Sequence, residues 1–248
     1  MNFADIRKGA WDTESTGPNP LEDRIVTAAF IVRGAGQQDH DFTWLINPGI
    51  PIPAEATAVH GITDEMVQAN GLDPKVALTE IADCLAYAID QCMPVIAFNQ
   101  SFDWSILHYD LLRNGLPTMA ERVGPGPLPL IDPHVIDKQV DKYVRGSGMR
   151  KLQPTAERYG VVLKDWHEAK ADALAALLIA EKQFAMHRQL NDMGPQQLYA
   201  AQKAWRAEQQ AGLQTWFRTK ATPEQGGAPD KVIDGSWPLI LAPNGGEA

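Results

Sequence analysis

The chain has 248 residues, 44% of them hydrophobic and 21% charged, which is enough for one large globular domain with an extension. Its 22 Lys and Arg against 31 Asp and Glu give a net charge of −9, which argues against a protein that holds nucleic acid by charge alone. An enzyme that meets phosphate through divalent ions is still allowed, because each ion reverses the local charge. The sequence has no apolar run long enough for a membrane span and no secretory signal at its start, and Cys84 and Cys92 suit neither a disulfide scaffold nor a zinc site. We therefore expect a cytoplasmic protein.

The first third of the chain predicts strands followed by a helix. Apolar runs at 25–32 and 42–46 predict two strands, and the glycines at 34–36 predict a hairpin between them. The stretch 6–11 carries two basic residues, so a first strand there is expected to be short or incompletely buried. An Asp-Pro pair and apolar residues at helical spacing predict a helix over 73–89.

The middle of the chain continues this alternation. The apolar run 94–98 predicts a short buried strand, and a helix is expected to begin after the turn at 99–101. Residues 130–131 predict another short strand. The helix predicted around 174–184 is apolar apart from Glu181. Strands interleaved with helices indicate an α/β domain with a mixed sheet.

The character of the sequence changes near residue 191. Pro195 can start a long helix, 221–230 is rich in Pro, Gly and polar residues, and 236–239 could dock back onto the body. The apolar stripe expected along the long helix comprises Leu198, Ala201, Trp205 and Trp216. We predict a domain over 1–190 and a helical C-terminal extension over 191–248.

Two carboxylates lie close together in the segment Asp12-Thr13-Glu14. Because Asp12 and Glu14 are two residues apart, both point to the same face of a strand. Side by side they repel each other unless a cation lies between them. Such a pair alone is more often a solvated surface or a turn than a functional site.

A second acidic motif, Asn99-Gln100-Ser101-Phe102-Asp103, follows the strand predicted at 94–98. The carboxyl edge of such a sheet is where α/β proteins gather ligands. The simpler interpretation is that Asp103 or Ser101 caps the helix. Phe102 is either ordinary core or a ring exposed for stacking on a base.

The third motif is His167 followed five residues later by Asp172. On a single helix these side chains would be about 140° apart, so they converge only if His167 lies on the loop before the helix. A histidine in that place, beside a metal-bound carboxylate, suits a general base. This spacing alone is commonplace.

Taken together, the three motifs resemble the DnaQ-like (DEDDh) family of 3′–5′ exonucleases. The segment 51–67 is similar to the loop after the strand meander in bacterial polymerase III epsilon-type proteins, and 131–132 and 152–160 also match family positions. The resemblance covers about residues 8–187. It implies a ribonuclease H-like fold, with a mixed five-stranded sheet flanked by helices.

The resemblance also implies roles for individual residues. Two divalent ions, Mg²⁺ or Mn²⁺, would be held by four carboxylates: Asp12, Glu14, Asp103 and Asp172. His167 would activate the attacking water. Hard oxygen ligands suit these ions, and in-line hydrolysis of a phosphodiester uses two of them. The residues expected at the terminal nucleotide are Glu14, Ser15, Thr16, His60 and Phe102, although His60 could equally be a loop histidine bonded to backbone.

The implied function is release of nucleoside 5′-monophosphates from single-stranded or frayed 3′ ends of DNA, in proofreading or repair. The epsilon-like segment 51–67 favours DNA, and an RNA-trimming enzyme of the RNase T or oligoribonuclease kind is the alternative. A non-catalytic module is less favoured because such modules usually lose a carboxylate. Phe98 stands where relatives commonly have His, which removes no catalytic group. A DNA polymerase is a candidate partner.

Overall fold

The computed structural model describes residues 3–162 and 168–242. These residues form one five-stranded sheet in the order β3-β2-β1-β4-β5, which confirms the predicted mixed α/β fold. The strands β1, β2 and β3 pair antiparallel, and β1, β4 and β5 pair parallel. The strands are β1 (Lys8–Ser15), β2 (Ile25–Arg33), β3 (His40–Leu45), β4 (Val95–Ile96) and β5 (Leu130–Ile131).

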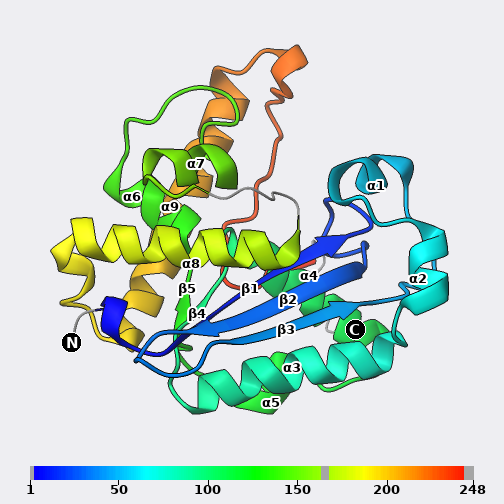
Figure 1. Cartoon of the computed structure of the whole chain (residues 1–248). Helices are drawn as coiled ribbons and strands as arrows, with labels where there is room; N and C mark the ends of the chain where they lie inside the picture. The colour runs from blue at the N-terminus through cyan, green and yellow to red at the C-terminus, as the bar shows by residue number, and fades with distance from the viewer. Residues whose placement is uncertain (1–2, 163–167, 243–248) are drawn as a thin grey trace.

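Helices cover both faces of this sheet (Figure 1). The helices are α1 (Ala54–His60), α2 (Asp64–Asn70), α3 (Pro74–Asp90), α4 (Gln100–Arg113), α5 (Met119–Val123), α6 (Pro133–Val140), α7 (Leu152–Arg158), α8 (Ala169–Met186) and α9 (Pro195–Thr219), with short 3₁₀ turns at Phe3–Asp5, Arg188–Leu190 and Pro223–Gln225. The long helices were predicted, but the segment 51–67, expected as a loop, contains α1 and the first half of α2. Gly61 ends α1 in the left-handed conformation, and the Thr63 hydroxyl caps α2.

Small side chains bring α8 close to the sheet. Ala173, Ala176 and Ala180 are buried and pack in one core cluster with Ala10 of β1 and Ile31 of β2. The opposite face of the sheet carries a second, larger core against α3 and α4, which includes Trp11. Since side chains alternate along a strand, Ala10 and Asp12 face α8 and Trp11 faces α4.

The first strand is longer and more buried than the sequence predicts. β1 begins at Lys8, whose side chain is fully buried. The Lys8 amine donates to the backbone carbonyls of Phe3, Ala4 and Ile6 at 3.0–3.2 Å and forms an ion pair with Glu181 of α8 at 3.0 Å. These partners compensate the buried charge, so a basic residue is accommodated at the start of a core strand.

The buried face of α9 differs from the predicted apolar stripe. Beyond Leu198, it buries the polar side chains Gln202, Arg206 and Gln210, whereas Trp216 is 38% exposed. Gln202 accepts a hydrogen bond from the backbone of Asp132 and donates to Leu130, so its burial is satisfied. The predicted docking of 236–239 is confirmed, because Trp237 is 3% exposed and belongs to the main core cluster.

Candidate active site

Asp12 and Glu14 project from the last half of β1 toward α8. The strand pairs in regular register with β2 as far as Glu14, and a register shift follows between Glu14 and Ser15. Regular pairing up to that point keeps both carboxylates on one face, as their spacing predicts. The shift ends the regular strand directly after the second carboxylate.

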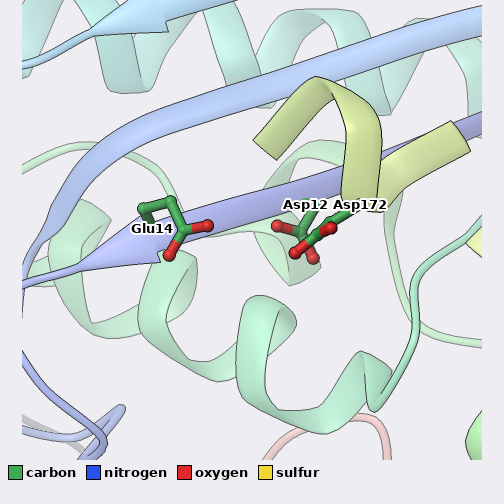
Figure 2. Close-up of side chains that lie close together, drawn as sticks. All are labelled: Asp12, Glu14 and Asp172. Carbon is green, nitrogen blue, oxygen red and sulfur yellow. The ribbon is translucent and has the colours of Figure 1, made fainter. Parts of the chain in front are cut away.

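Asp172 reaches the same place from the first turn of α8 and is largely buried. Among the described residues, Asp12, Glu14 and Asp172 form a group in which one carboxylate oxygen from each lies within 4.8 Å of the others. Figure 2 shows the two β1 side chains extending from one strand, with Asp172 meeting Asp12 from the helix. Three carboxylates at this spacing form a set of hard oxygen donors that fits divalent cations.

Asp103 approaches from the other side of β1, in the first turn of α4. Its Oδ1 accepts hydrogen bonds from the backbone N–H of Thr13 at 3.0 Å and from the Thr13 hydroxyl at 2.8 Å. Asp103 is therefore tied to the residue between Asp12 and Glu14. The sequence offers Thr13 only as the middle of the acidic motif, and its role in holding Asp103 was not predicted.

Burial, together with the charges of neighbouring carboxylates, raises the pKa values of these acidic side chains. Burial, followed by the charges of Asp103, Asp172 and Glu14, raises the pKa of Asp12 well above its usual range. Burial and the charges of Asp172 and Asp103 raise the pKa of Glu14 to about 8. Burial also raises the pKa of Asp103 to about 7, although its hydrogen bonds from Thr13 oppose this. A divalent cation would relieve this repulsion, so the electrostatics agree with the donor set.

The residues predicted to contact substrate lie in different settings. His60 shares with Glu14 a cavity of about 390 Å³ between β2, β3 and the start of α8. The His60 Nδ1 accepts from the backbone of Ile62 at 3.1 Å, and partial burial lowers the pKa of this imidazole. His60 therefore lies in the wall of this cavity and is bonded to backbone, but it is the last residue of α1 and not the loop residue considered from the sequence.

Ser15, Thr16 and Phe102 are held by local contacts. The Ser15 hydroxyl donates to the Gly17 carbonyl at 2.7 Å, and the buried Thr16 hydroxyl donates to Asp23 at 3.0 Å. Phe102 is partly buried and packs against the main core cluster. The predicted general base, His167, lies outside the described residues.

Comparison with known proteins agrees with this arrangement. The family model RNase_T, described as exonuclease, matches residues 10–180. The chain belongs to this exonuclease family. The match confirms the resemblance to DnaQ-like exonucleases, and it spans all three acidic motifs.

The curated relatives are much longer proteins. The PolC-type DNA polymerase III of Pediococcus pentosaceus is 25% identical over 222 residues, which is 84% of this chain and 14% of the polymerase. The PolC-type enzyme of Streptococcus thermophilus strain LMD-9 is 28% identical over 166 residues, or 66% of this chain and 10% of the polymerase. This chain thus spans one seventh or less of these two relatives.

Solved exonuclease structures share the fold. Exonuclease I from Methylocaldum szegediense superposes with a TM-score of 0.58 at 20% identity, covering 75% of this chain and 42% of that one. E. coli Exonuclease I in complex with a dT13 oligonucleotide gives a TM-score of 0.61 at 17% identity, covering 76% of this chain and 43% of that one. Exonuclease X in complex with 5′ overhanging duplex DNA gives a TM-score of 0.56 at 18% identity, covering 78% of this chain and 98% of that one. The ribonuclease H-like architecture is thereby confirmed. No helix within residues 3–162 and 168–242 is long and apolar enough to cross a membrane.

Proposed function

We propose that this chain is a metal-dependent 3′–5′ exonuclease that hydrolyses DNA to nucleoside 5′-monophosphates. The observation that carries the proposal is the convergence of Asp12, Glu14 and Asp172 within 4.8 Å, at the place in an exonuclease fold where β1 ends and α8 begins. A binding module without activity would have no need of these three clustered carboxylates, because burial and the neighbouring charges raise the pKa of Asp12 and of Glu14 at a cost in stability.

Each acidic residue has a distinct part in this proposal. Asp12, Glu14 and Asp172 would hold two divalent ions, Mg²⁺ or Mn²⁺, with Asp103 completing the set. When bound, such ions generate the hydroxide nucleophile and stabilise the leaving 3′ oxygen. His167, placed by sequence just before α8, would accept the proton of the attacking water.

The terminal nucleotide would lie beside Glu14. The backbone from Glu14 to Thr16, the His60 edge of the 390 Å³ cavity and the ring of Phe102 would surround it. The relatives favour DNA as the substrate, because they include DNA polymerases and exonucleases whose structures hold DNA. Proofreading or repair beside a DNA polymerase is the role that fits the PolC-type relatives.

A labelled-end assay tests the proposal. We expect 5′-labelled single-stranded DNA to shorten stepwise with Mg²⁺ or Mn²⁺, to stay intact in excess chelator, and to resist when its 3′ end is blocked. Asp12→Asn should lose this activity, whereas Asp192→Asn, outside the 10–180 family match, should keep it. Full activity in chelator would refute the metal-dependent mechanism. Faster degradation of matched RNA would assign the chain to RNA trimming instead.

A further inference from the structure

The C-terminal segment around Ile240 is bonded directly to α4, the helix that carries Asp103. The backbone N–H of Ile240 donates to the hydroxyl of Ser105 at 2.8 Å, and the hydroxyl of Tyr109 donates to the carbonyl of Ile240 at 3.0 Å. Ser105 is fully buried and lies two residues after Asp103. The C-terminal segment therefore fixes this helix at two points one turn apart.

A second connection runs through the buried carboxylate of Asp132. Its Oδ2 accepts a hydrogen bond from the indole N–H of Trp237 at 3.2 Å, and its Oδ1 accepts from the backbone N–H of Asn99 at 3.0 Å. Asn99 has the left-handed conformation, with φ of 66°, directly before the first residue of α4. Asparagine adopts this conformation more readily than most non-glycine residues, and the bond to Asp132 holds the Asn99 backbone in it.

α9 holds Asp132 as well, through the backbone of that residue. The side-chain oxygen of Gln202 accepts from the backbone N–H of Asp132 at 2.7 Å, and its amide donates to the carbonyl of Leu130 at 2.9 Å. Burial raises the pKa of Asp132, and the charge of Arg206 on the same helix opposes this rise. The supporting residues Gln202, Arg206 and Trp237 all lie beyond the 10–180 family match.

The contacts form a continuous path to the carboxylate group. Trp237 holds Asp132, Asp132 holds Asn99 at the start of α4, and Asp103 in the first turn of α4 is bonded to Thr13 between Asp12 and Glu14. We propose that the C-terminal segment 237–240 and Asp132 position α4, so that Asp103 is held against β1 in the geometry required for metal binding. In this arrangement Trp237 is a positioning residue, and the inference rests on the proposed function.

The substitution Trp237→Phe tests this path because it removes the indole N–H and keeps an aromatic ring against Tyr199. The matched control is Trp216→Phe, on the exposed part of α9. Mn²⁺ affinity would be measured by calorimetry without DNA, together with the Mg²⁺ dependence of exonuclease rate and the thermal midpoint Tm. We expect Trp237→Phe to weaken Mn²⁺ binding about tenfold, the lower end of the effect of outer-shell changes, and Trp216→Phe to match the wild type.

The outcomes distinguish positioning from plain stabilisation. If Trp237→Phe lowers Tm but keeps wild-type Mn²⁺ affinity and Mg²⁺ dependence, the inference is wrong while the proposed function stands. Should Trp237→Phe not fold, Ser105→Ala, which removes the acceptor for the Ile240 N–H, must show the same weaker Mn²⁺ binding. Wild-type protein that neither binds Mn²⁺ nor degrades DNA would overturn the proposed function and the inference together.

Discussion

In the metal-free protein, the ionised form of Glu14 opposes folding. Burial and the charges of Asp172 and Asp103 raise its pKa from 4.5 to about 8. Between these values the folded state keeps a proton that the unfolded state releases. The free energy of unfolding must then fall as the pH rises from 4.5 toward 8, because the unfolded state binds fewer protons than the native state. Replacing Glu14 by Gln removes this titration.

The size of the effect follows from the pKa difference. At pH 7 the pH is about 2.5 units above the pKa of the Glu14 carboxyl in the unfolded state. The ionisation of Glu14 on unfolding then lowers the free energy of unfolding by at most about 3 kcal/mol. Because Glu14 is partly exposed, solvent screening reduces this to about 2 kcal/mol. We expect Glu14→Gln to raise Tm by about 4–8 °C at pH 7 in EDTA, for a chain of this size. At pH 4.5 it should change Tm little.

Scanning calorimetry in EDTA at pH 4.5 and pH 7 measures this difference. Glu208→Gln, on an exposed part of α9, removes a carboxylate away from the group and serves as the control. Adding Mn²⁺ should reverse the order of Tm values, since a cation that binds only the native wild-type site stabilises it by mass action. The reasoning is refuted if Glu14→Gln shifts Tm equally at both pH values, or destabilises the metal-free protein at both.

Three further predictions concern other parts of the molecule. His167→Ala should lower the hydrolysis rate about 10²–10⁴-fold and remove the rise of rate with pH, while calorimetric Mn²⁺ affinity stays near wild type; loss of Mn²⁺ binding would contradict its role as a base. Glu181→Ala should lower the free energy of unfolding in urea by about 2–3 kcal/mol, because it leaves the buried amine of Lys8 without its carboxylate partner. An unchanged urea midpoint would show that the three backbone carbonyls are enough to compensate the charge of Lys8. Phe102→Ala should raise KM for DNA more than it lowers kcat, and the opposite pattern in steady-state kinetics would remove Phe102 from substrate binding.

Hydrophobic periodicity predicts the strands and long helices because each of them buries one face. It fails where polar groups are buried with partners from distant parts of the chain. The interruption at Lys8 suggests a weak first strand, yet Glu181 lies 173 residues away and local sequence gives no sign of the pairing. On α9, the pattern of apolar residues correctly selects Leu198 and the partly buried Trp205. It also selects Trp216, which is exposed, and it misses the buried Gln202 and Arg206.

In the candidate site, too, local sequence predicts some positions, and contacts between distant residues set the others. The two-residue spacing of Asp12 and Glu14 is enough to place them on one face of β1, and the helix start places Asp172 near them. The position of Asp103 beside β1 depends on hydrogen bonds from Thr13. These bonds follow from the tertiary structure, and the spacing of residues in the sequence does not predict them. The metal-binding and catalytic roles of these residues stay predictions until the assays described above are done.

The alanines of α8 have a consequence for how this site could diverge. Ala173 follows Asp172 directly, and with Ala176 and Ala180 it lets the helix axis lie close to β1 and β2. A bulkier residue at any of these positions would lift the helix and carry Asp172 away from Asp12, even though every acidic residue would still be present. In a homologous chain, therefore, an intact set of acidic motifs does not guarantee activity. The volume of the side chains beneath α8 decides whether those carboxylates can share an ion.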